Sequence, residues 1–568
     1  MKDFKCVVGK LLKGLVPELE EEEILGLIET PPDPKMGDFA FPAFSLAKSR
    51  RKNPAMIAAE IAEAISSDEV SAKAMGPYVN FFVGRDVFAK TVMEEVLEKG
   101  MDFGKSSRGE GETIVLDYSS PNIAKPFHIG HIRTTVIGDA IKRIYDYQGF
   151  ETVAVNHLGD YGTQFGLMIE AYLRWGEREV IEKNPIPELV KLYVRINTEA
   201  KENSELLENG RKWFVRLEQG DEEAVKLWKW FREVSLKDFQ RVYDLLGITF
   251  DSFRGESFYS DLMPAVVEEL DEKGLLVDSQ GAKIVELEEY KLPPAIIVKS
   301  DGSTIYVTRD LATAKFRKET YDFAKNVYVV GTQQNLHFQQ LFAILDKMGY
   351  DWAKDCVHVP FGMVSLPEGT LSTRRGTVVY LEDVLNKAID KVEEILKERE
   401  RERGTTLEGR DTLAKQVGIG AVKFQELFNQ RIKDYTFDWD RTLSFEGETG
   451  PYVQYTHARI ASLLRRGNFS PEDSIDPALL TEEDEFLLLR GLYDFEGVIT
   501  DACKKHEPYL VTRHIVEVAK TFNKYYTRTT VLTEDKDLAR ARLALAYGVK
   551  CLIARGLNLL GIEAPESM

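Results

Sequence analysis

His128-Ile129-Gly130-His131 lies where a short apolar strand, Ile114–Leu116, gives way to a stretch with the pattern of an amphipathic helix. We expect that helix from about Ile132 through Gln148, because its apolar residues recur on one stripe at helical spacing. The unpaired N–H groups at such a helix start favour phosphate, and each imidazole can donate a hydrogen bond to phosphate oxygens. The glycine between them lets a flat base or ribose approach the backbone. Taken alone, the same residues fit a structural role or a chance metal-like spacing equally well.

Outward from this turn, residues 112–400 alternate apolar strands with amphipathic helices, which is typical of βαβ units and a parallel sheet. The candidate strands are Thr113–Leu116, Thr152–Asn156, Ala295–Lys299, Val327–Val330 and Val357–Pro360. Residues 167–290 are rich in helix and are expected to form an insertion between two halves of the sheet. Ligands in such folds gather at the carboxyl ends of the strands, and the His128 motif follows one of those ends.

Three blocks in and around this motif carry a family resemblance. They are Asp117-Tyr118-Ser119-Ser120-Pro121-Asn122-Ile123-Ala124-Lys125-Pro126-Phe127, Gly138-Asp139 and Asn156-His157-Leu158-Gly159-Asp160-Tyr161-Gly162-Thr163-Gln164-Phe165-Gly166. Together they resemble the signature segments of arginyl-tRNA synthetases, class I enzymes that attach arginine to its tRNA. The resemblance implies an α/β fold with a class I Rossmann-like catalytic domain. It also implies that the chain activates L-arginine with ATP to arginyl-adenylate, transfers arginine to the 3′ end of tRNA(Arg), and releases AMP and pyrophosphate.

The pattern along the chain predicts three domains. Residues 1–107 form a small α/β domain that ends in a Gly/Ser-rich linker, and the resemblance implies that this domain contacts tRNA. Residues 108–404 hold the Rossmann-like domain with its helical insertion. Residues 405–568 are almost wholly helical in pattern, which predicts an α-helical bundle. The resemblance implies that this bundle binds the anticodon.

Five residues are expected to hold the amino acid. Tyr306 and Asp310 are four residues apart, so they share a face if their segment is helical. The resemblance places them, with Asp117, on the guanidinium of arginine, although many family members have Glu at position 117. It places Asn122 and Gln334 on the α-amino end. Without the resemblance, Asp310 also suits an ordinary acid at a helix start, and Gln334 suits a cap or surface amide.

ATP is assigned to the histidine motif and to a second segment. The resemblance implies that His128, Gly130 and His131 bind ATP and that both histidines are catalytic. Ser372-Thr373-Arg374-Arg375 stands where class I synthetases carry a mobile Lys-Met-Ser-Lys-Ser loop that clamps ATP, and both lysines are missing. Lys125 occupies the place where a lysine is thought to compensate in such members, while Arg374 and Arg375 offer cations to the departing pyrophosphate. A basic surface turn is the alternative for this segment. Mg²⁺ is expected to travel with ATP, held largely by phosphates and water.

Candidate RNA contacts lie in both outer domains. Lys48, Arg50, Arg51 and Lys52 form a basic cluster that suits RNA phosphate or is simply solvated. In the last domain, aromatic side chains are candidates for stacking on unpaired anticodon bases, with core packing as the alternative for each. They are Tyr452, Tyr455, Phe522, Tyr525 and Tyr526.

Composition limits the remaining choices. The 568 residues carry a formal net charge of −19, which argues against a general nucleic-acid coat but not against a local basic face. The four cysteines are scattered without a C-x-x-C pair, so neither a zinc site nor a disulfide framework is indicated and the cytoplasm is expected. No membrane span, organic prosthetic group or resident metal is indicated, and a monomer is expected. Two alternatives stay open: another class I synthetase or tRNA-independent adenylate-forming enzyme, and a non-catalytic RNA-binding paralogue.

Overall fold

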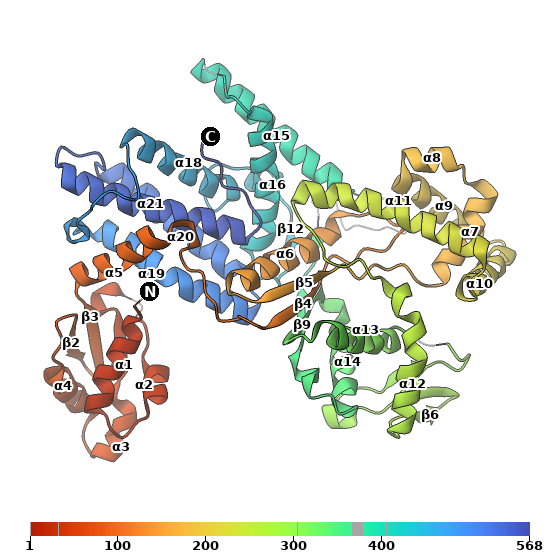
Figure 1. Ribbon diagram of the computed structural model, residues 1–568, viewed down its shortest axis with the longest axis horizontal. Coiled ribbons are helices and arrows are strands. Elements are labelled where there is room, and N and C mark those ends of the chain that lie inside the picture. Colours follow the sequence, from red (N-terminus) through yellow and green to blue (C-terminus); the bar gives the residue numbers. More distant parts are fainter. Residues whose placement is uncertain (1, 32, 304, 366–378, 405) are drawn as a thin grey trace.

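The computed structural model describes residues 2–31, 33–303, 305–365, 379–404 and 406–568. The first part of the chain is a three-stranded antiparallel sheet, in the order β1-β3-β2, covered by helices (Figure 1). Its elements are α1 (Phe4–Leu15), α2 (Glu21–Leu27), β1 (Phe39–Pro42), α3 (Ala47–Arg50), α4 (Pro54–Ala64), β2 (Val70–Met75), β3 (Tyr78–Val83) and α5 (Arg85–Lys99). Buried Asp38 accepts a hydrogen bond from Val83 N and pairs with Arg490 at 2.6 Å, which ties this sheet to the C-terminal helices.

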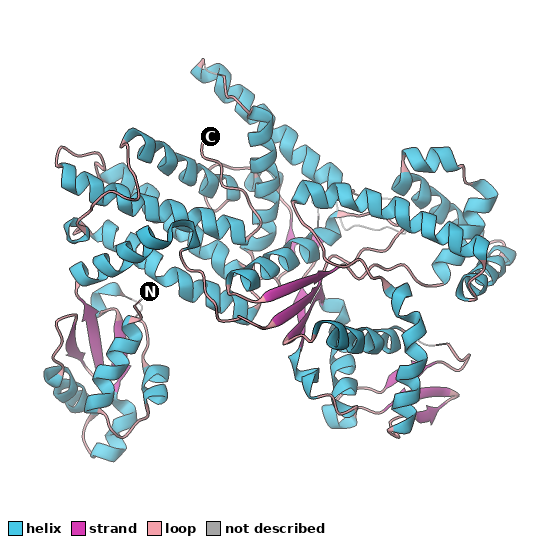
Figure 2. Cartoon of the chain, in the orientation of Figure 1, coloured by secondary structure: helices cyan, strands magenta, loops and turns pink. Residues whose placement is uncertain are grey.

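The central sheet has four parallel strands in the order β10-β9-β4-β5 (Figure 2). They are β4 (Thr113–Asp117), β5 (Glu151–Val155), β9 (Lys325–Gly331) and β10 (Cys356–Phe361). These four strands and the helix after the His128 motif, α6 (Ile132–Tyr147), confirm the expected elements to within one or two residues at their ends. β4 lies between β5 and β9, and the chain order reverses between β4 and β9. Parallel sheets bind ligands beside the carboxyl ends of strands at such a reversal.

The fifth expected strand belongs to a different sheet, so its assignment to the parallel sheet is wrong. Ala295–Val298 is β8, which pairs antiparallel with β7 (Ala282–Val285), and β7 pairs in turn with β6 (Val277–Ser279). Ile296 is 44% exposed while its neighbours Ala295 and Ile297 are buried. Four consecutive apolar residues cannot reveal whether one face or both faces of a strand will be covered.

A helical segment separates the two halves of the sheet. It consists of α7 (Thr163–Trp175), α8 (Arg178–Lys183), α9 (Pro185–Glu199), α10 (Ser204–Glu218), α11 (Glu222–Leu246) and α12 (Met263–Glu272). Helices α7–α10 form a lobe that projects from the sheet, and the long α11 returns from that lobe to the sheet (Figure 1). Tyr243 on α11 anchors this return, because its hydroxyl lies 2.8 Å from both Ser119 Oγ and Asn156 Nδ2. The predicted limits of the insertion, 167–290, stay a prediction.

The C-terminal part of the chain is a bundle of helices. Before it in the chain, α13 (Tyr306–Tyr321) precedes β9, α14 (Asn335–Lys347) connects β9 to β10, and β11 (Val364–Ser365) and α15 (Leu381–Arg403) follow β10. The bundle itself contains α16 (Arg410–Phe428), α17 (Trp439–Thr442), α18 (Gly450–Arg466), α19 (Glu483–Lys505), α20 (Tyr509–Arg528) and α21 (Lys536–Leu559). One short strand interrupts the helical pattern: β12 (Tyr435–Thr436) pairs in parallel with β11. None of the helices in the described ranges is long and apolar enough to cross a membrane.

Candidate active site

Two histidines at the start of α6 are held in a fixed orientation by backbone N–H groups. His128 Nδ1 accepts a hydrogen bond from Gly130 N at 3.0 Å, and His131 Nδ1 accepts one from His128 N at 3.2 Å. Each ring therefore carries its proton on Nε2 when it is neutral. The two rings lie close together, with their centroids 4.0 Å apart. The turn thus presents a pair of Nε2–H donors beside a helix N-terminus, as a phosphate would require.

Burial keeps both imidazoles neutral. It lowers the pKa of His131 to about 3, with a further contribution from the neighbouring His128, and it lowers the pKa of His128 as well. At neutral pH the rings are therefore hydrogen-bond donors without a net charge. Gly130 is required by this turn, because a Cβ there would lie 2.8 Å from Cε1 of His128. The glycine makes room for the histidine ring, and its contact with a nucleotide stays a prediction.

Lys125 and the chain that follows residue 378 border the same turn. Lys125 Nζ lies 5.7 Å from the centroid of the Tyr193 ring on α9, and its charge contributes to the low pKa of His131. The second predicted ATP segment, Ser372, Thr373, Arg374 and Arg375, falls outside the described residues. Beyond that segment the chain returns to the histidine turn, where Ile129 N donates to Val379 O at 3.2 Å.

Asp310, the carboxylate expected to bind a guanidinium, projects from the N-terminal part of α13 and is held by a histidine. His337 Nε2, on α14, lies 2.6 Å from Asp310 Oδ2. Burial opposes ionisation of Asp310, but the hydrogen bond with His337 and the charges of His157 and Arg309 hold the pKa of its carboxyl below the usual range. Tyr306, one helical turn earlier, is 71% exposed. The structure therefore offers a charged carboxylate and an accessible hydroxyl from one helix.

The two amides expected at the α-amino end follow two different strands. Asn122, after β4, forms a parallel bridge with Gly159, after β5. Gly159 allows this close approach, because a Cβ there would lie 2.0 Å from Asn122 Oδ1. Gln334 is exposed in the turn between β9 and α14. Both amides thus lie past the carboxyl ends of strands, Asn122 after β4 and Gln334 after β9. Their contact with a substrate stays a prediction.

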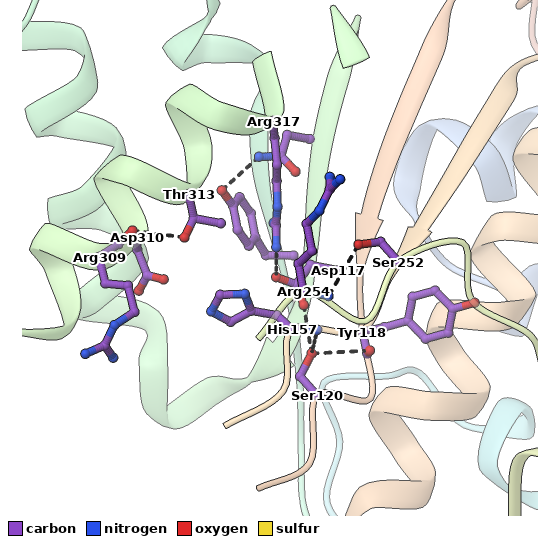
Figure 3. Close-up of polar contacts among 12 residues, drawn as sticks. Asp117, Tyr118, Ser120, His157, Ser252, Arg254, Arg309, Asp310, Thr313 and Arg317 are labelled. Atoms are coloured by element: carbon purple, nitrogen blue, oxygen red, sulfur yellow. Dashed lines mark hydrogen bonds and ion pairs between the residues drawn. The ribbon is translucent and has the colours of Figure 1, made fainter. Parts of the chain in front are cut away.

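Asp117 differs from the expectation of an available carboxylate, because both of its oxygens already have partners. Oδ2 lies 2.7 Å from Nη2 of Arg317, and Oδ1 accepts a hydrogen bond from Ser120 Oγ at 2.9 Å. Figure 3 shows Arg317 reaching from α13 to Asp117, with His157 on the side that faces Asp310. Arg317 is completely buried. An internal guanidinium therefore lies beside Asp117, and the contact of this carboxylate with the substrate guanidinium stays a prediction.

Three titratable residues of this region were missed by the sequence prediction: Arg317, His157 and Glu256. Arg317 follows Asp310 by seven residues, so helical spacing alone places the two on one face of α13. Glu256 pairs with Arg309 at 3.1 Å, and burial raises the pKa of this carboxyl to about 7. No local pattern marks Glu256, because its partner lies more than fifty residues along the chain.

A cavity of about 1330 Å³ opens beside Arg309, between the helical lobe and α13. Tyr306 and Arg309 line it on the α13 side. Aromatic and acidic side chains also line it, among them Asp160, Tyr161, Trp228 and Phe258. A space of this size, with apolar walls and a few charges, accommodates a ligand as large as a nucleoside.

The predicted RNA contacts divide into exposed and buried residues. Lys48 and Arg51 are exposed, whereas Arg50 pairs with Glu18 at 2.7 Å and Lys52 pairs with Glu60 at 2.7 Å. The cluster is therefore partly neutralised by acidic residues within its own domain.

On α18, Tyr452 and Tyr455 are half-buried, and the Arg459 guanidinium lies 4.9 Å from the centroid of the Tyr455 ring. Phe522 and Tyr525 are completely buried, which excludes them as base-stacking residues and confirms the alternative of core packing. They lie on the core face of α20 and pack within the bundle. Only the α18 pair stays a candidate, together with the half-buried Tyr526.

Within the described ranges, no group of three or more His, Cys, Asp and Glu side chains is arranged to hold a metal ion. The four cysteines are unpaired.

Three family models match the chain in succession. Residues 2–83 match the arginyl tRNA synthetase N-terminal domain. Residues 92–439 match the catalytic domain of the class I tRNA synthetases (R). Residues 453–568 match the DALR anticodon binding domain.

Similar proteins cover the chain from end to end. It is 55% identical to the arginine–tRNA ligase of Halothermothrix orenii and 56% identical to that of Clostridioides difficile, each over 570 aligned residues and 100% of both chains. Among solved structures, arginyl-tRNA synthetase from Thermus thermophilus superposes with a TM-score of 0.82 at 24% identity, covering 100% of both chains. Arginyl-tRNA synthetase from Plasmodium falciparum gives a TM-score of 0.81 at 25% identity, covering 100% of this chain and 98% of the other.

Proposed function

The chain belongs to the arginyl-tRNA synthetase family, and from this we infer that it attaches L-arginine to tRNA(Arg) at the expense of ATP. The observation that carries the inference is the match to arginine–tRNA ligases over the whole chain, with the paired histidine donors present at the start of α6. The reaction is that of a class I aminoacyl-tRNA synthetase: it passes through arginyl-adenylate and releases pyrophosphate and then AMP.

In the first step, the carboxylate of arginine attacks the α-phosphorus of ATP in line. A carboxyl oxygen forms a bond to the α-phosphorus. The bond between the α-phosphorus and the oxygen that bridges the α- and β-phosphates breaks, and pyrophosphate departs. His128 and His131 donate from Nε2 to the phosphate oxygens, on which negative charge builds in the transition state. Lys125, Arg374 and Arg375 add cationic donors for pyrophosphate, and Ser372 and Thr373 contact ATP. ATP enters as its magnesium complex, with the ion held largely by phosphates and water.

Arginine is selected by its guanidinium. Asp310 accepts hydrogen bonds from this planar cation, and Tyr306 covers it from the preceding helical turn. Asn122 and Gln334 hold the α-amino end. The ammonium of lysine cannot supply the same planar fork of donors. A buried carboxylate oxygen would then be left unpaired, which costs more than ~1–3 kcal/mol because the group is charged. Specificity of this kind requires no separate editing site.

In the second step, a ribose hydroxyl at the 3′ end of tRNA attacks the carbonyl carbon of arginyl-adenylate, and AMP leaves. Positioning and charge stabilisation drive both steps, without a covalent enzyme intermediate. Lys48, Arg50 and Arg51 contact tRNA phosphates, and Tyr452 and Tyr455 stack on bases of the anticodon loop. We place the enzyme in the cytoplasm. We also propose that it is a monomer, and light scattering of the purified chain tests this oligomeric state.

The experiment is arginine-dependent ATP–pyrophosphate exchange, measured with and without tRNA against a panel of amino acids. Exchange with arginine alone is the expected result. Exchange with another amino acid points to a different class I activity. No exchange from a folded chain that still binds tRNA points to a non-catalytic RNA-binding paralogue.

A further inference from the structure

Arg431 fastens the end of β10 to the C-terminal bundle. It lies in the connection between α16 and α17, and its Nη1 donates to Pro360 O at 2.7 Å. Its carbonyl oxygen accepts from Gly362 N at 2.9 Å, so it binds the chain on both sides of the last β10 residue. Toward the bundle, Nε donates to His506 O at 3.1 Å and the backbone N donates to Glu507 Oε1 at 3.2 Å. One largely buried residue therefore joins the edge strand of the parallel sheet to the turn between α19 and α20.

The same connection pairs with the chain that leaves β10. β12 and β11 form a two-stranded parallel sheet of their own, and Phe437 N donates to Ser365 O at 2.8 Å. Gly362 permits this close approach, because a Cβ there would lie 2.6 Å from Oδ1 of Asp434 and 2.7 Å from the carbonyl oxygen of Ile432. The path of the chain immediately after β10 is thus tied to the connection that leads to the bundle.

β11 brings this connection to the histidine turn (Ile129–His131). β11 lies against that turn. Arg133, in the first turn of α6, donates to Gly362 O at 3.0 Å and to Lys433 O at 2.8 Å. The Nε2 donors of the two histidines therefore rest on a chain that Arg431 holds in place. Preorganised donors act only when they are aimed at the developing charge, and a misplacement of about 1 Å can cost a hundredfold in rate.

A second contact fixes the bundle side of this joint. The Tyr145 hydroxyl on α6 lies 2.7 Å from Nε2 of His506, and both groups are buried. Burial lowers the pKa of His506 to about 4, so the ring is neutral at physiological pH. The turn between α19 and α20 is thus held to α6 by Tyr145 and to β10 by Arg431. α6, which begins at the histidine turn, is tied to the bundle near its far end as well.

We propose that Arg431 is a positioning residue for adenylate formation, which aims the histidine turn by way of β11 instead of by contact with a substrate. The inference rests on the proposed function, because it concerns the rate of the first step of that reaction. A guanidinium suits this task, since its planar fork donates in two directions at once, to the strand and to the bundle turn.

The test is a double-mutant cycle in the full-length chain. Arg431→Ala, Arg431→Lys and His131→Ala are each made alone, and each Arg431 variant is also combined with His131→Ala. Single-turnover assays with saturating tRNA give the rate of adenylate formation, pyrophosphate exchange gives the arginine KM, and thermal unfolding gives Tm. Arg540→Ala is the matched control, because Arg540 makes contacts of the same kind inside the bundle: it donates to two main-chain oxygens and pairs with Asp473 at 2.8 Å.

Arg431→Ala should lower the rate about tenfold and keep the arginine KM within about threefold, because the histidine donors move and the arginine site does not. Arg431→Lys should recover part of the rate, since it keeps the charge and one donor group. In the His131→Ala background, Arg431→Ala should cost less than about threefold, because one of the donors that it positions is already gone. Arg540→Ala should lower Tm and leave the rate at the wild-type value.

The proposal is overturned if folded Arg431 variants form adenylate at the wild-type rate, or if Arg431→Ala costs the same factor with and without His131. An equal loss of rate in Arg540→Ala also overturns it, because the loss would then come from the stability of the bundle. If Arg431→Ala does not fold, the cycle of Arg431→Lys with His131→Ala decides in the same way. A wild-type chain that activates no amino acid refutes the proposed function and this inference together, whereas activation of arginine with multiplicative losses refutes the inference alone.

Discussion

His337 Nε2 lies 2.6 Å from Oδ2 of Asp310, in a contact that joins the N-terminal parts of α13 and α14. Figure 3 shows the Asp310 carboxylate on the side of α13 that faces His157. A carboxylate held by a second side chain cannot rotate between ligands, so its remaining oxygen is fixed before the substrate arrives. His337 thus orients the carboxylate that we propose binds arginine, a role that the sequence alone did not assign to it.

Replacing His337 by Ala should raise the arginine KM about tenfold, because Asp310 loses both a charge-assisted hydrogen bond and its fixed orientation. The ATP KM should stay near the wild-type value, since the histidine motif is untouched. His337→Gln, which keeps a donor at a similar reach, serves as the control and should recover part of the loss. Exchange kinetics over a range of arginine concentrations measure the arginine KM, and kinetics over a range of ATP concentrations measure the ATP KM. Equal arginine KM values for Ala and wild type would remove His337 from the site.

His131→Ala should lower the rate of adenylate formation about a hundredfold while changing the arginine KM little, as removal of one preorganised donor does elsewhere. The pKa of His131 is about 3, so the neutral ring is the donor and its loss should be equally large from about pH 6 to pH 8. His131→Gln offers an amide donor at the position of Nε2 and should restore part of the rate. A single-turnover assay of adenylate formation measures it, and a rate unchanged by the Ala substitution would contradict this role.

Lys125 precedes the histidine motif by three residues, and its charge helps to lower the pKa of His131. If it compensates for the lysines missing from the second ATP segment, Lys125→Ala should slow adenylate formation more than transfer to tRNA. Lys125→Arg keeps the charge and is the matched control. Pre-steady-state assays separate the two steps. Near-normal adenylate formation in Lys125→Ala would assign the cation to Arg374 or Arg375 instead.

Local patterns in the sequence predicted the elements that carry the histidine motif. The strand β4, the turn at His128 and the amphipathic α6 follow each other within a short stretch, so spacing alone fixes them. The parallel direction of β4, β5, β9 and β10 follows from the helices that connect the strands. Tyr306 and Asp310 share a helix because their separation of four residues matches its period.

Contacts between distant residues were beyond such patterns. Asp117 and Arg317 are separated by two hundred residues, so nothing local shows that the carboxylate is already paired. Phe522 and Tyr525 have the composition of a stacking surface, but the packing of α20 against its neighbours turns them into the core. Ala295–Lys299 has the apolar character of a buried strand, and only its pairing with β7 shows that it belongs to the smaller sheet.

Tyr455 and Lys48 should affect tRNA binding in different ways. Tyr455→Ala should weaken binding about tenfold by removing one stacking surface, without changing the salt dependence, since stacking is worth ~1–3 kcal/mol per base. Lys48→Ala should reduce the slope of log affinity against log salt by about one, as loss of a phosphate contact does. Fluorescence titration of labelled tRNA at several salt concentrations measures both. Unchanged affinity and slope in a variant would exclude that residue from the RNA interface.

Glu426 on α16 and Arg133 on α6 join the C-terminal bundle to the helix of the histidine motif. Their side chains have no exposed surface, and Glu426 Oε2 lies 3.4 Å from Arg133 Nε. Arg133 also donates to Gly362 O at 3.0 Å and Lys433 O at 2.8 Å, and Tyr435 donates its hydroxyl to Glu426. Burial outweighs the attraction of Arg133 and raises the pKa of Glu426 from 4.5 to about 7.

A raised pKa in the folded state makes stability fall as pH increases through this window. Between about pH 4.5 and pH 7 the native chain holds a proton on Glu426 that the unfolded chain has released, so each rise in pH favours unfolding. Glu426→Gln removes the titration and keeps the shape. The free energy of unfolding of wild type minus that of the variant should therefore decrease by roughly 3 kcal/mol across the window. Urea unfolding at closely spaced pH values measures this difference, with Glu268→Gln at an exposed position of α12 as the control that should show none. A difference that is constant or increases with pH would mean that Arg133 keeps Glu426 ionised in the folded chain.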